Sequence, residues 1–165
     1  MTDGRRSIIT LTSVAPSILE PTGDVRRFAA RQPGYGAIVA HTELGTVTDF
    51  VHVKVASIHH LDVHASSPTR PADGRVTTSV GTQHTLRLAA FDESGEPLAG
   101  AVSLSWIVDG DAIAVASTDG LVVNVTAVGQ GTATLRAAVD VSQNADDDTR
   151  ASAARFEAVF NVQGP

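Results

Sequence analysis

The sequence predicts an all-β protein made of tandem β-sandwiches, the first of which is incomplete. Apolar and polar residues alternate along most segments, as they do in strands with one buried and one solvated face. Clusters of Gly, Asp and Pro interrupt these segments at a spacing of about 8–12 residues, which is typical of a sandwich. In addition, residues 9–40 align without a gap on residues 106–137 at a constant offset of 97. Such self-similarity indicates two copies of one structural unit.

The aligned copies share glycines and apolar positions. Gly23 aligns with Gly120, and Gly34 aligns with Gly131. The apolar matches are Leu11 with Val108, Ile18 with Val115, Phe28 with Val125, Ala30 with Ala127, Ile38 with Leu135 and Ala40 with Ala137. The second copy is whole, whereas the first has no counterpart of residues 58–98. We therefore expect a partial module over residues 1–56 and a complete module over residues 57–165.

The complete module is expected to hold seven or eight strands and almost no helix. Residues 84–92 place Leu86, Leu88 and Ala90 on one face, and residues 131–140 and 153–162 do the same with Leu135 and Phe160. We expect the irregular stretch 65–75 to kink an edge strand and the polar stretch 141–152 to form a hairpin loop. The expected strands are 58–64, 76–80, 84–92, 102–108, 113–117, 121–127, 131–140 and 153–162, the first two being halves of one edge strand.

The partial module is expected to lack its first strands and to leave a sheet edge and an apolar face uncovered. Either a neighbouring chain or sequence upstream covers them, or this half is poorly ordered. The connection Val55-Ala56-Ser57 is very short, which favours a stiff, end-to-end rod. The expected strands of this module are 6–12, 17–20, 25–31, 35–42 and 46–55.

Composition excludes several classes of function. The net charge of −6 argues against a nucleic-acid partner, which needs a basic patch. No cysteine is present, so disulfides and thiolate metal sites are excluded. No apolar run is long enough to span a membrane, and the first residues do not form a secretory signal. Any export signal is therefore expected upstream.

The second module resembles the group 2 bacterial immunoglobulin-like domains of intimin- and invasin-type adhesins. The resemblance is carried by the order of the segments 79–82, 92–98, 102–106, 112–115, 119–122, 126–129 and 131–137, which include Asp92-Glu-Ser-Gly95, Val102-Ser-Leu-Ser-Trp106 and Asp119-Gly120. The first module carries the later part, including Pro21-Thr-Gly23 and Gly34-Tyr-Gly36. The luminal repeats of the large membrane glycoprotein of the nuclear pore are similar in pattern. The resemblance implies immunoglobulin-like sandwiches and supplies no catalytic residues.

The resulting hypothesis is a non-enzymatic spacer or stalk module of a larger multi-repeat protein that supports adhesion or assembly, at the cell surface or outside the cell. Its partners would be neighbouring modules, and the incomplete module could self-associate. One alternative is a self-associating luminal pore repeat, located in the perinuclear lumen. Another is a module that binds a receptor or carbohydrate through the loops 92–98, 109–112 and 141–152, although these loops carry no aromatic residue.

The sequence offers few candidate sites, and no cofactor is expected. Oxygen ligands in one loop make Asp140, Asp146, Asp147 and Asp148 weak calcium candidates, although their spacing is not that of an EF-hand. Asn124 begins an Asn-Val-Thr sequon and is a candidate for glycosylation on the outer face of its strand. The expected structural core contains Leu86, Leu88, Trp106, Val125, Leu135 and Phe160, with Trp106 at the centre of the sandwich.

Histidines and serines do not form recognisable catalytic or metal motifs. His60 and His64 would share a strand face with Asp62, but zinc requires three or four converging ligands. A modest pH effect near these residues is a more reasonable expectation than a metal. No serine lies in a Gly-x-Ser-x-Gly turn.

Overall fold

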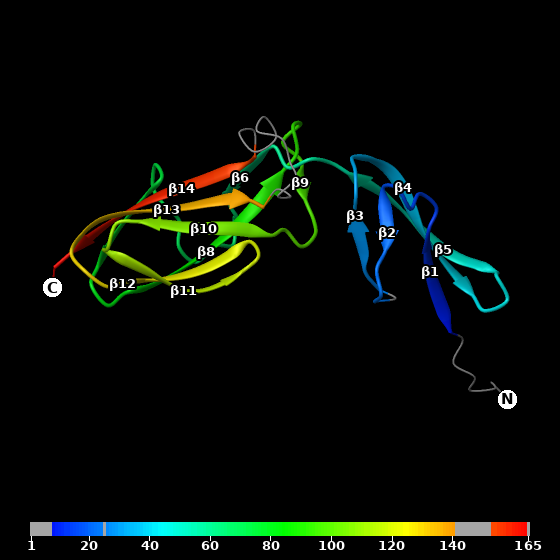
Figure 1. Ribbon diagram of the computed structural model, residues 1–165, viewed down its shortest axis with the longest axis horizontal. Coiled ribbons are helices and arrows are strands. Elements are labelled where there is room, and N and C mark those ends of the chain that lie inside the picture. The colour runs from blue at the N-terminus through cyan, green and yellow to red at the C-terminus, as the bar shows by residue number, and fades with distance from the viewer. Residues whose placement is uncertain (1–7, 25, 141–152, 165) are drawn as a thin grey trace. The chain divides into compact units, whose positions relative to one another are not determined.

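The computed structural model describes residues 8–24, 26–140 and 153–164. These residues form fourteen strands and no helix, which confirms the predicted all-β class. The chain divides into two units between Ser57 and Ile58. Both units have the strand arrangement of an immunoglobulin-like sandwich, and the first is incomplete (Figure 1).

The second unit is a sandwich of two sheets. One sheet has the order β10-β13-β14-β7, and the other has the order β11-β12-β8-β6, with the short β9 also paired to β8. This is the arrangement of strands C, F, G and A′ facing strands D, E, B and A in an immunoglobulin domain. The bounds are β6 (His60–Val63), β7 (Arg75–Ser79), β8 (Gln83–Phe91), β9 (Pro97–Leu98), β10 (Leu104–Asp109), β11 (Ile113–Asp119), β12 (Val122–Ala127), β13 (Gly131–Val139) and β14 (Arg155–Gln163).

The predicted edge strand divides between the two sheets. β6 pairs antiparallel with β8, whereas β7 pairs parallel with β14, with Arg75 opposite Val159 and Ser79 opposite Gln163. Buried Ser67 fastens the crossing segment, because the Arg87 amide donates to its Oγ at 3.0 Å and that hydroxyl donates to the Thr69 carbonyl at 2.7 Å. One continuous stretch of chain therefore completes both sheets.

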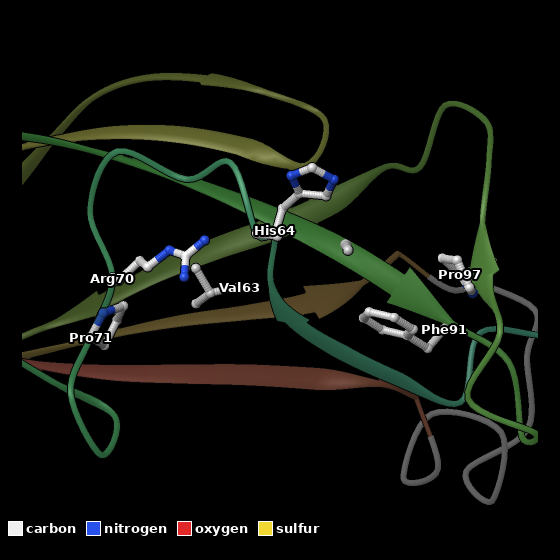
Figure 2. A pocket seen from close by; sticks show the side chains of 8 residues that line it. Val63, His64, Arg70, Pro71, Phe91 and Pro97 are labelled. Carbon is white, nitrogen blue, oxygen red and sulfur yellow. The ribbon is translucent and has the colours of Figure 1, made fainter.

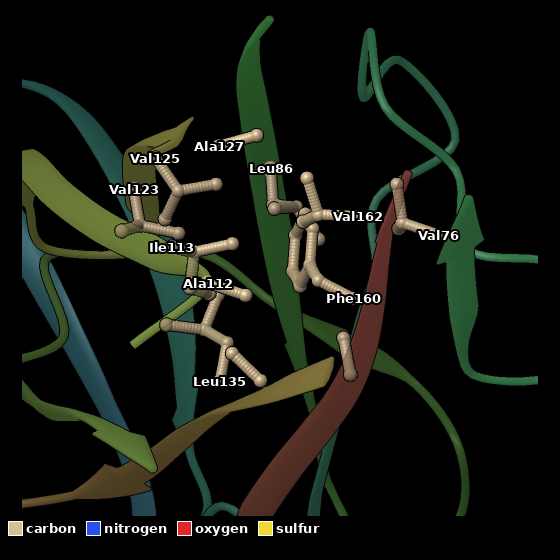
Figure 3. Close-up of a cluster of buried hydrophobic side chains, with 12 residues drawn as sticks. Val76, Leu86, Ala112, Ile113, Val123, Val125, Ala127, Leu135, Phe160 and Val162 are labelled. Carbon is tan, nitrogen blue, oxygen red and sulfur yellow. The ribbon is translucent and has the colours of Figure 1, made fainter. Parts of the chain in front are cut away.

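The core lies between the two sheets and is aliphatic except for one phenylalanine. Phe160 on β14, Leu135 on β13 and Leu86 on β8 are fully buried, as are Val123 and Val125 on β12. Figure 3 shows these side chains converging from both sheets. The alternation predicted for these strands therefore corresponds to their buried and solvated faces.

Trp106 occupies a different place from the expected one. It is half-buried and packs against the edges of both apolar clusters of the second unit. Its indole Nε1 donates to the Gly120 carbonyl at 3.4 Å. The large residue at the centre of the sandwich is Phe160. It lies on the part of β14 that pairs with both β13 and β7.

The turn that precedes β9 depends on a buried carboxylate. Asp92 Oδ1 accepts hydrogen bonds from the Ser94 amide at 2.9 Å, the Ser94 hydroxyl at 2.7 Å and the Glu96 amide at 2.9 Å. Gly95 adopts φ +81°, which suits glycine. The predicted turn cluster is present, and it leads into the short strand β9, which the sequence did not indicate.

The first unit contains a three-stranded sheet and a separate strand pair. β4 (Gly34–Thr42) lies between β1 (Ile9–Ser13) and β5 (Val47–Val55). β2 (Leu19–Pro21) pairs antiparallel with β3 (Phe28–Ala30). These five strands correspond in order and pairing to β10–β14 of the second unit, and the described residues 8–24 and 26–57 contain no counterpart of β6, β7 or β8.

The repeat identifies matched positions in the two units. β4 and β13 have identical bounds at the offset of 97, and Gly34 and Gly131 begin them with φ +154° and +131°. Gly36 pairs with Val53, as Ala133 pairs with Phe160. Val53 therefore takes the place in the first unit that Phe160 takes in the second.

Gly110→Ala should destabilise the second unit. Gly110 has φ +102°, and a Cβ atom there would lie 2.8 Å from the Thr132 carbonyl oxygen, which belongs to the backbone. We expect a loss of about 1–3 kcal/mol in the free energy of unfolding, measured by urea denaturation. Gly129→Ala is the matched control, because its added Cβ would approach no closer than 3.6 Å to the Asp111 carbonyl oxygen. Equal stability of the two variants would contradict this description of the turn.

Phe160→Ala and Val53→Ala test whether the two matched positions differ in burial. Phe160 is fully buried and Val53 is half-buried. Phe160→Ala should lower the free energy of unfolding of the second unit by about 3–5 kcal/mol. Fluorescence of Trp106, the one tryptophan of the chain, reports this transition. Val53→Ala should leave the same transition unchanged, and a comparable loss in both variants would show that the units do not unfold separately.

Candidate functional site

The candidate site is the open side of the first unit, which we define as the free edges of β3 and β5 and the apolar sheet face between them. In the second unit, β12 pairs with β8 and β14 pairs with β7. Among residues 8–24 and 26–57, the matched strands β3 and β5 pair only with β2 and β4, respectively. Each therefore presents an edge of backbone N–H and C=O groups at which another strand can pair.

The sheet face next to these edges is apolar and only partly covered. Register places Ile38 on β4 beside Val51 on β5, and Leu11 on β1 lies beside Ala40. Leu19 and Ala15 lie against Gly36 at one end of the face, within 3.4 and 3.5 Å of the position of its added Cβ. Towards the other end, Ile9 is 48% exposed and Val51 is 55% exposed.

The two units differ sharply in apolar burial. Among the described residues, nineteen apolar side chains are buried, and only Leu19 and Ala37 of these belong to the first unit. Twelve large apolar side chains are exposed, and eight of these belong to the first unit: Ile8, Ile9, Val14, Tyr35, Leu44, Val47, Phe50 and Val51. Exposed apolar side chains are therefore concentrated in the first unit, and they lie on both faces of its sheet.

Charge limits the apolar face at one end. Asp49 lies opposite Ala40 on β5, on the same face as Val51 and Val53. The matched position in the second unit is held by Phe156, which pairs with Ala137. An inward-pointing charge of this kind opposes indiscriminate pairing along an edge strand. The apolar part of β5 therefore runs from Val51 to Val55.

The second unit has a shallow hollow of about 480 Å³ on the outer side of β8. Figure 2 shows Phe91 and Pro97 on one side of it and Arg70 and Pro71 on the other. The ring of His60 stacks on Phe91, with 4.8 Å between the centroids and 7° between the planes. Apolar residues dominate the lining, and no arrangement of a nucleophile and a base is present among the residues that line it.

His84 is a residue that the sequence analysis did not single out. It lies on the inward face of β8, where its Nε2 hydrogen-bonds with Thr78 Oγ1 at 2.8 Å and its ring meets Phe160 edge-on at 5.7 Å. Its Nδ1 lies 3.3 Å from Thr69 Oγ1. Burial lowers the pKa of His84 below the ordinary value of 6.5. A His at an inward position of an alternating strand was the signal that could have identified it.

The sequon residue Asn124 is half-buried and spans three strands. Its Oδ1 accepts from Thr85 Oγ1 at 2.6 Å on β8, and its Nδ2 donates to Ser117 Oγ at 2.9 Å on β11. Asn124 lies on the outer face of β12, opposite in direction to Val123 and Val125. Glycosylation of Asn124 stays a prediction.

The calcium candidates are only partly described. Asp140 is exposed and accepts a hydrogen bond from the Ser105 hydroxyl. Asp146, Asp147 and Asp148, together with the rest of the loop 141–152, lie outside the described residues. Within residues 8–24, 26–140 and 153–164, no group of three or more His, Cys, Asp or Glu side chains is placed to hold a metal ion. Over the same ranges, no helix is long and apolar enough to cross a membrane.

His84→Gln tests the pH dependence that this histidine confers. Because the folded-state pKa is lowered, the unfolded chain binds the proton more readily. The contribution of His84 to stability should therefore be present above pH 6.5, decrease as the pH falls through 6.5, and level off below the folded-state pKa. Urea denaturation of wild type and His84→Gln across this range should show a stability difference that shrinks towards acid pH. A pH-independent difference would contradict the neutral, buried state of His84.

Comparisons with known proteins found similar shapes among solved structures. The sequence matches no protein-family model and no curated protein. Solved structures of similar shape include surface layer protein SbsC domains 1–6, with a TM-score of 0.45, 17% identity, and coverage of 95% of this chain and 20% of that one. The Escherichia coli adhesin FdeC gives a TM-score of 0.40 and 18% identity over 91% of this chain and 51% of that one. A titin tandem of immunoglobulin domains gives a TM-score of 0.35 and 12% identity, and the match covers 81% of this chain and 63% of that one.

This chain thus spans about a fifth of the SbsC fragment and half of the FdeC structure. TM-scores below 0.5 at these identities do not show a shared family. The immunoglobulin-like assignment rests on strand order and pairing within the chain itself.

Proposed function

We propose that this chain is a non-enzymatic spacer of a larger multi-repeat surface or extracytoplasmic protein, with modules of the bacterial immunoglobulin-like kind. The observation that carries the proposal is the direct succession of two copies of one strand arrangement. β5 ends at Val55 and β6 begins at His60, so only residues 56–59 connect the last strand of one copy to the first strand of the next. A connection this short restricts the freedom of consecutive units.

The strand pairing of the second unit supports a load-bearing role. β7 lies near the start of the unit and β14 at its end, and they pair in parallel over five residues. Tension applied to the two ends of the unit would shear this ladder, so that all of its hydrogen bonds resist together. The Val159 amide donates to the Gly74 carbonyl at 2.8 Å and the Val80 amide to the Gln163 carbonyl at 3.3 Å, at the two ends of the ladder.

Spin-label distance measurements test the spacer proposal. The chain contains no cysteine, so Thr12→Cys on β1 and Ala114→Cys on β11, both exposed, introduce one label in each unit. We expect a narrow distance distribution for this chain. A matched variant with about eight Gly and Ser residues inserted after Ser57 should give a broad one, because such linkers behave as flexible coils. Equally broad distributions in both chains would overturn the spacer proposal.

A further inference from the structure

We propose that the outer face of the β4–β5 hairpin is a binding site for a linear acidic polysaccharide. The outer face is the one directed away from β2. Gly36 shows the direction, because a Cβ atom added to it would lie 3.4 Å from Leu19 Cδ1, so that the neighbouring Tyr35 and Ala37 point the opposite way. This inference concerns a binding surface and does not depend on the spacer role.

Aromatic rings form a strip on this outer face. Its side chains belong to three cross-strand pairs: Tyr35 with Lys54, Ala37 with His52, and Val39 with Phe50. Tyr35 is 76% exposed and Phe50 is 59% exposed, and the Phe50 ring meets the His52 ring edge-on at 5.3 Å. From Phe50 to Lys54 the strip is roughly 14 Å long, which accommodates about three sugar rings in a row.

The second unit carries polar residues at the same positions. The matched pairs are Thr132 with Asn161, Thr134 with Val159, and Arg136 with Glu157. Arg136 Nε donates to Glu157 Oε2 at 2.9 Å, and Thr132 Oγ1 donates to Asn161 Oδ1 at 3.2 Å. Arg136 and Glu157 are both exposed, so this face is solvated in a unit that has both of its sheets. The exposure of the rings in the first unit therefore does not result from the strands that this unit lacks.

Exposed ring faces on a flat sheet suit a sugar. The C–H face of a sugar ring is apolar and weakly positive, whereas the face of an aromatic ring is weakly negative, so the two stack. Thr10 and Thr12 are exposed on the same face of β1, opposite His41 and Val39, and their hydroxyls can bond to sugar hydroxyls beside the rings. A strip that follows one hairpin fits an extended polymer better than a compact ligand.

Charge favours an acidic polymer over a neutral one. Lys54 is exposed on this face, and the imidazoles of His41 and His52 are cationic when protonated. The two carboxylates of the hairpin lie elsewhere, Asp49 on the opposite face and Glu43 in the turn between the strands. The chain as a whole has a net charge of −6, so this face differs in sign from its surroundings and complements a polymer that bears carboxylates.

A nucleic acid is a less suitable polyanion for this face. Its bases would stack on the rings, but its affinity depends on several contacts between phosphates and lysine or arginine. Among the described residues of this face, Lys54 is the one side chain of that kind. Uronate residues carry their charge more sparsely and need fewer such contacts.

The one tyrosine of the chain reports binding at the proposed site. Incorporation of fluorotyrosine gives a single fluorine resonance at Tyr35, which is followed by NMR during titration of the full chain. The acidic probes are hexasaccharides of galacturonate and of hyaluronan. Cellohexaose is the neutral control, and hexathymidylate tests a nucleic acid. Calorimetry gives the dissociation constants, and light scattering gives the mass of each sample.

The variants exchange residues of the strip for those of the second unit or remove its lysine. Tyr35→Thr introduces the residue of the matched position 132, and Phe50→Gln introduces the neutral analogue of Glu157. Because the second unit folds with such residues, the hairpin should keep its structure, which circular dichroism checks. Lys54→Gln removes the charge alone. Val51→Thr is the matched control, since Val51 is exposed on the opposite face of β5.

The proposal predicts that an acidic hexasaccharide shifts the resonance and binds with a dissociation constant of about 0.1–1 mM. Tyr35→Thr combined with Phe50→Gln should weaken binding at least about tenfold, Lys54→Gln should weaken it about threefold, and Val51→Thr should leave it unchanged. No shift with either acidic probe at about 5 mM would overturn the proposal. Equal or tighter binding of cellohexaose or hexathymidylate would also overturn it, as would full affinity in the double variant. A resonance that changes with protein concentration, in sugar-free samples whose mass is that of a dimer, would overturn it and identify a second copy as the occupant.

Discussion

Burial of the inner sheet faces against each other is the interaction on which this structure depends. An aliphatic core with one central phenylalanine holds the second unit together, and Phe160, Leu135 and Leu86 meet there from three strands. Those contacts exist because residues 60–91 pass from the edge of one sheet to the edge of the other. The same passage lets β7 pair with β14 and β8 pair with β12, so that one stretch of chain both covers the core and pairs with these two strands.

Residues 8–24 and 26–57 of the first unit contain no equivalent of this covering segment. β1, β4 and β5 keep the strand order of β10, β13 and β14, and β2 pairs antiparallel with β3 as β11 does with β12, although the registers of β1 on β4 and of β2 on β3 differ from those in the second unit. Backbone pairing alone does not create a core, so positions that would be buried are half-buried or exposed. The difference in burial between Val53 and Phe160 therefore depends on the surrounding residues as well as on the size of the two side chains. This difference leaves one copy of the repeat with a buried core and the other with apolar side chains that are half-buried or exposed.

Alternation and repetition in the sequence were sufficient to predict the fold. The alternating pattern around Leu86 and Leu135 predicted which faces of their strands are buried. The alignment of Gly34 with Gly131 predicted that the strands they begin are equivalent. Features that depend on contacts distant in sequence could not be predicted. The burial of His84 depends on Thr78 and Phe160 beside it, and Trp106 is half-buried against two apolar clusters that strands distant in sequence form together. The open side of the first unit was predicted, because it follows from strands that the repeat shows to be missing.

Amide hydrogen exchange on the unmodified chain, at a concentration where light scattering shows a monomer, tests the central claim most directly. The account predicts that amides of β8, β13 and β14 exchange slowly, through global unfolding of the second unit, whereas amides along β3 and β5 exchange faster by orders of magnitude. Exchange in β5 as slow as that in β14, in a monomer, would contradict the claim. It would mean that the first unit completes its sandwich without a segment equivalent to residues 58–98.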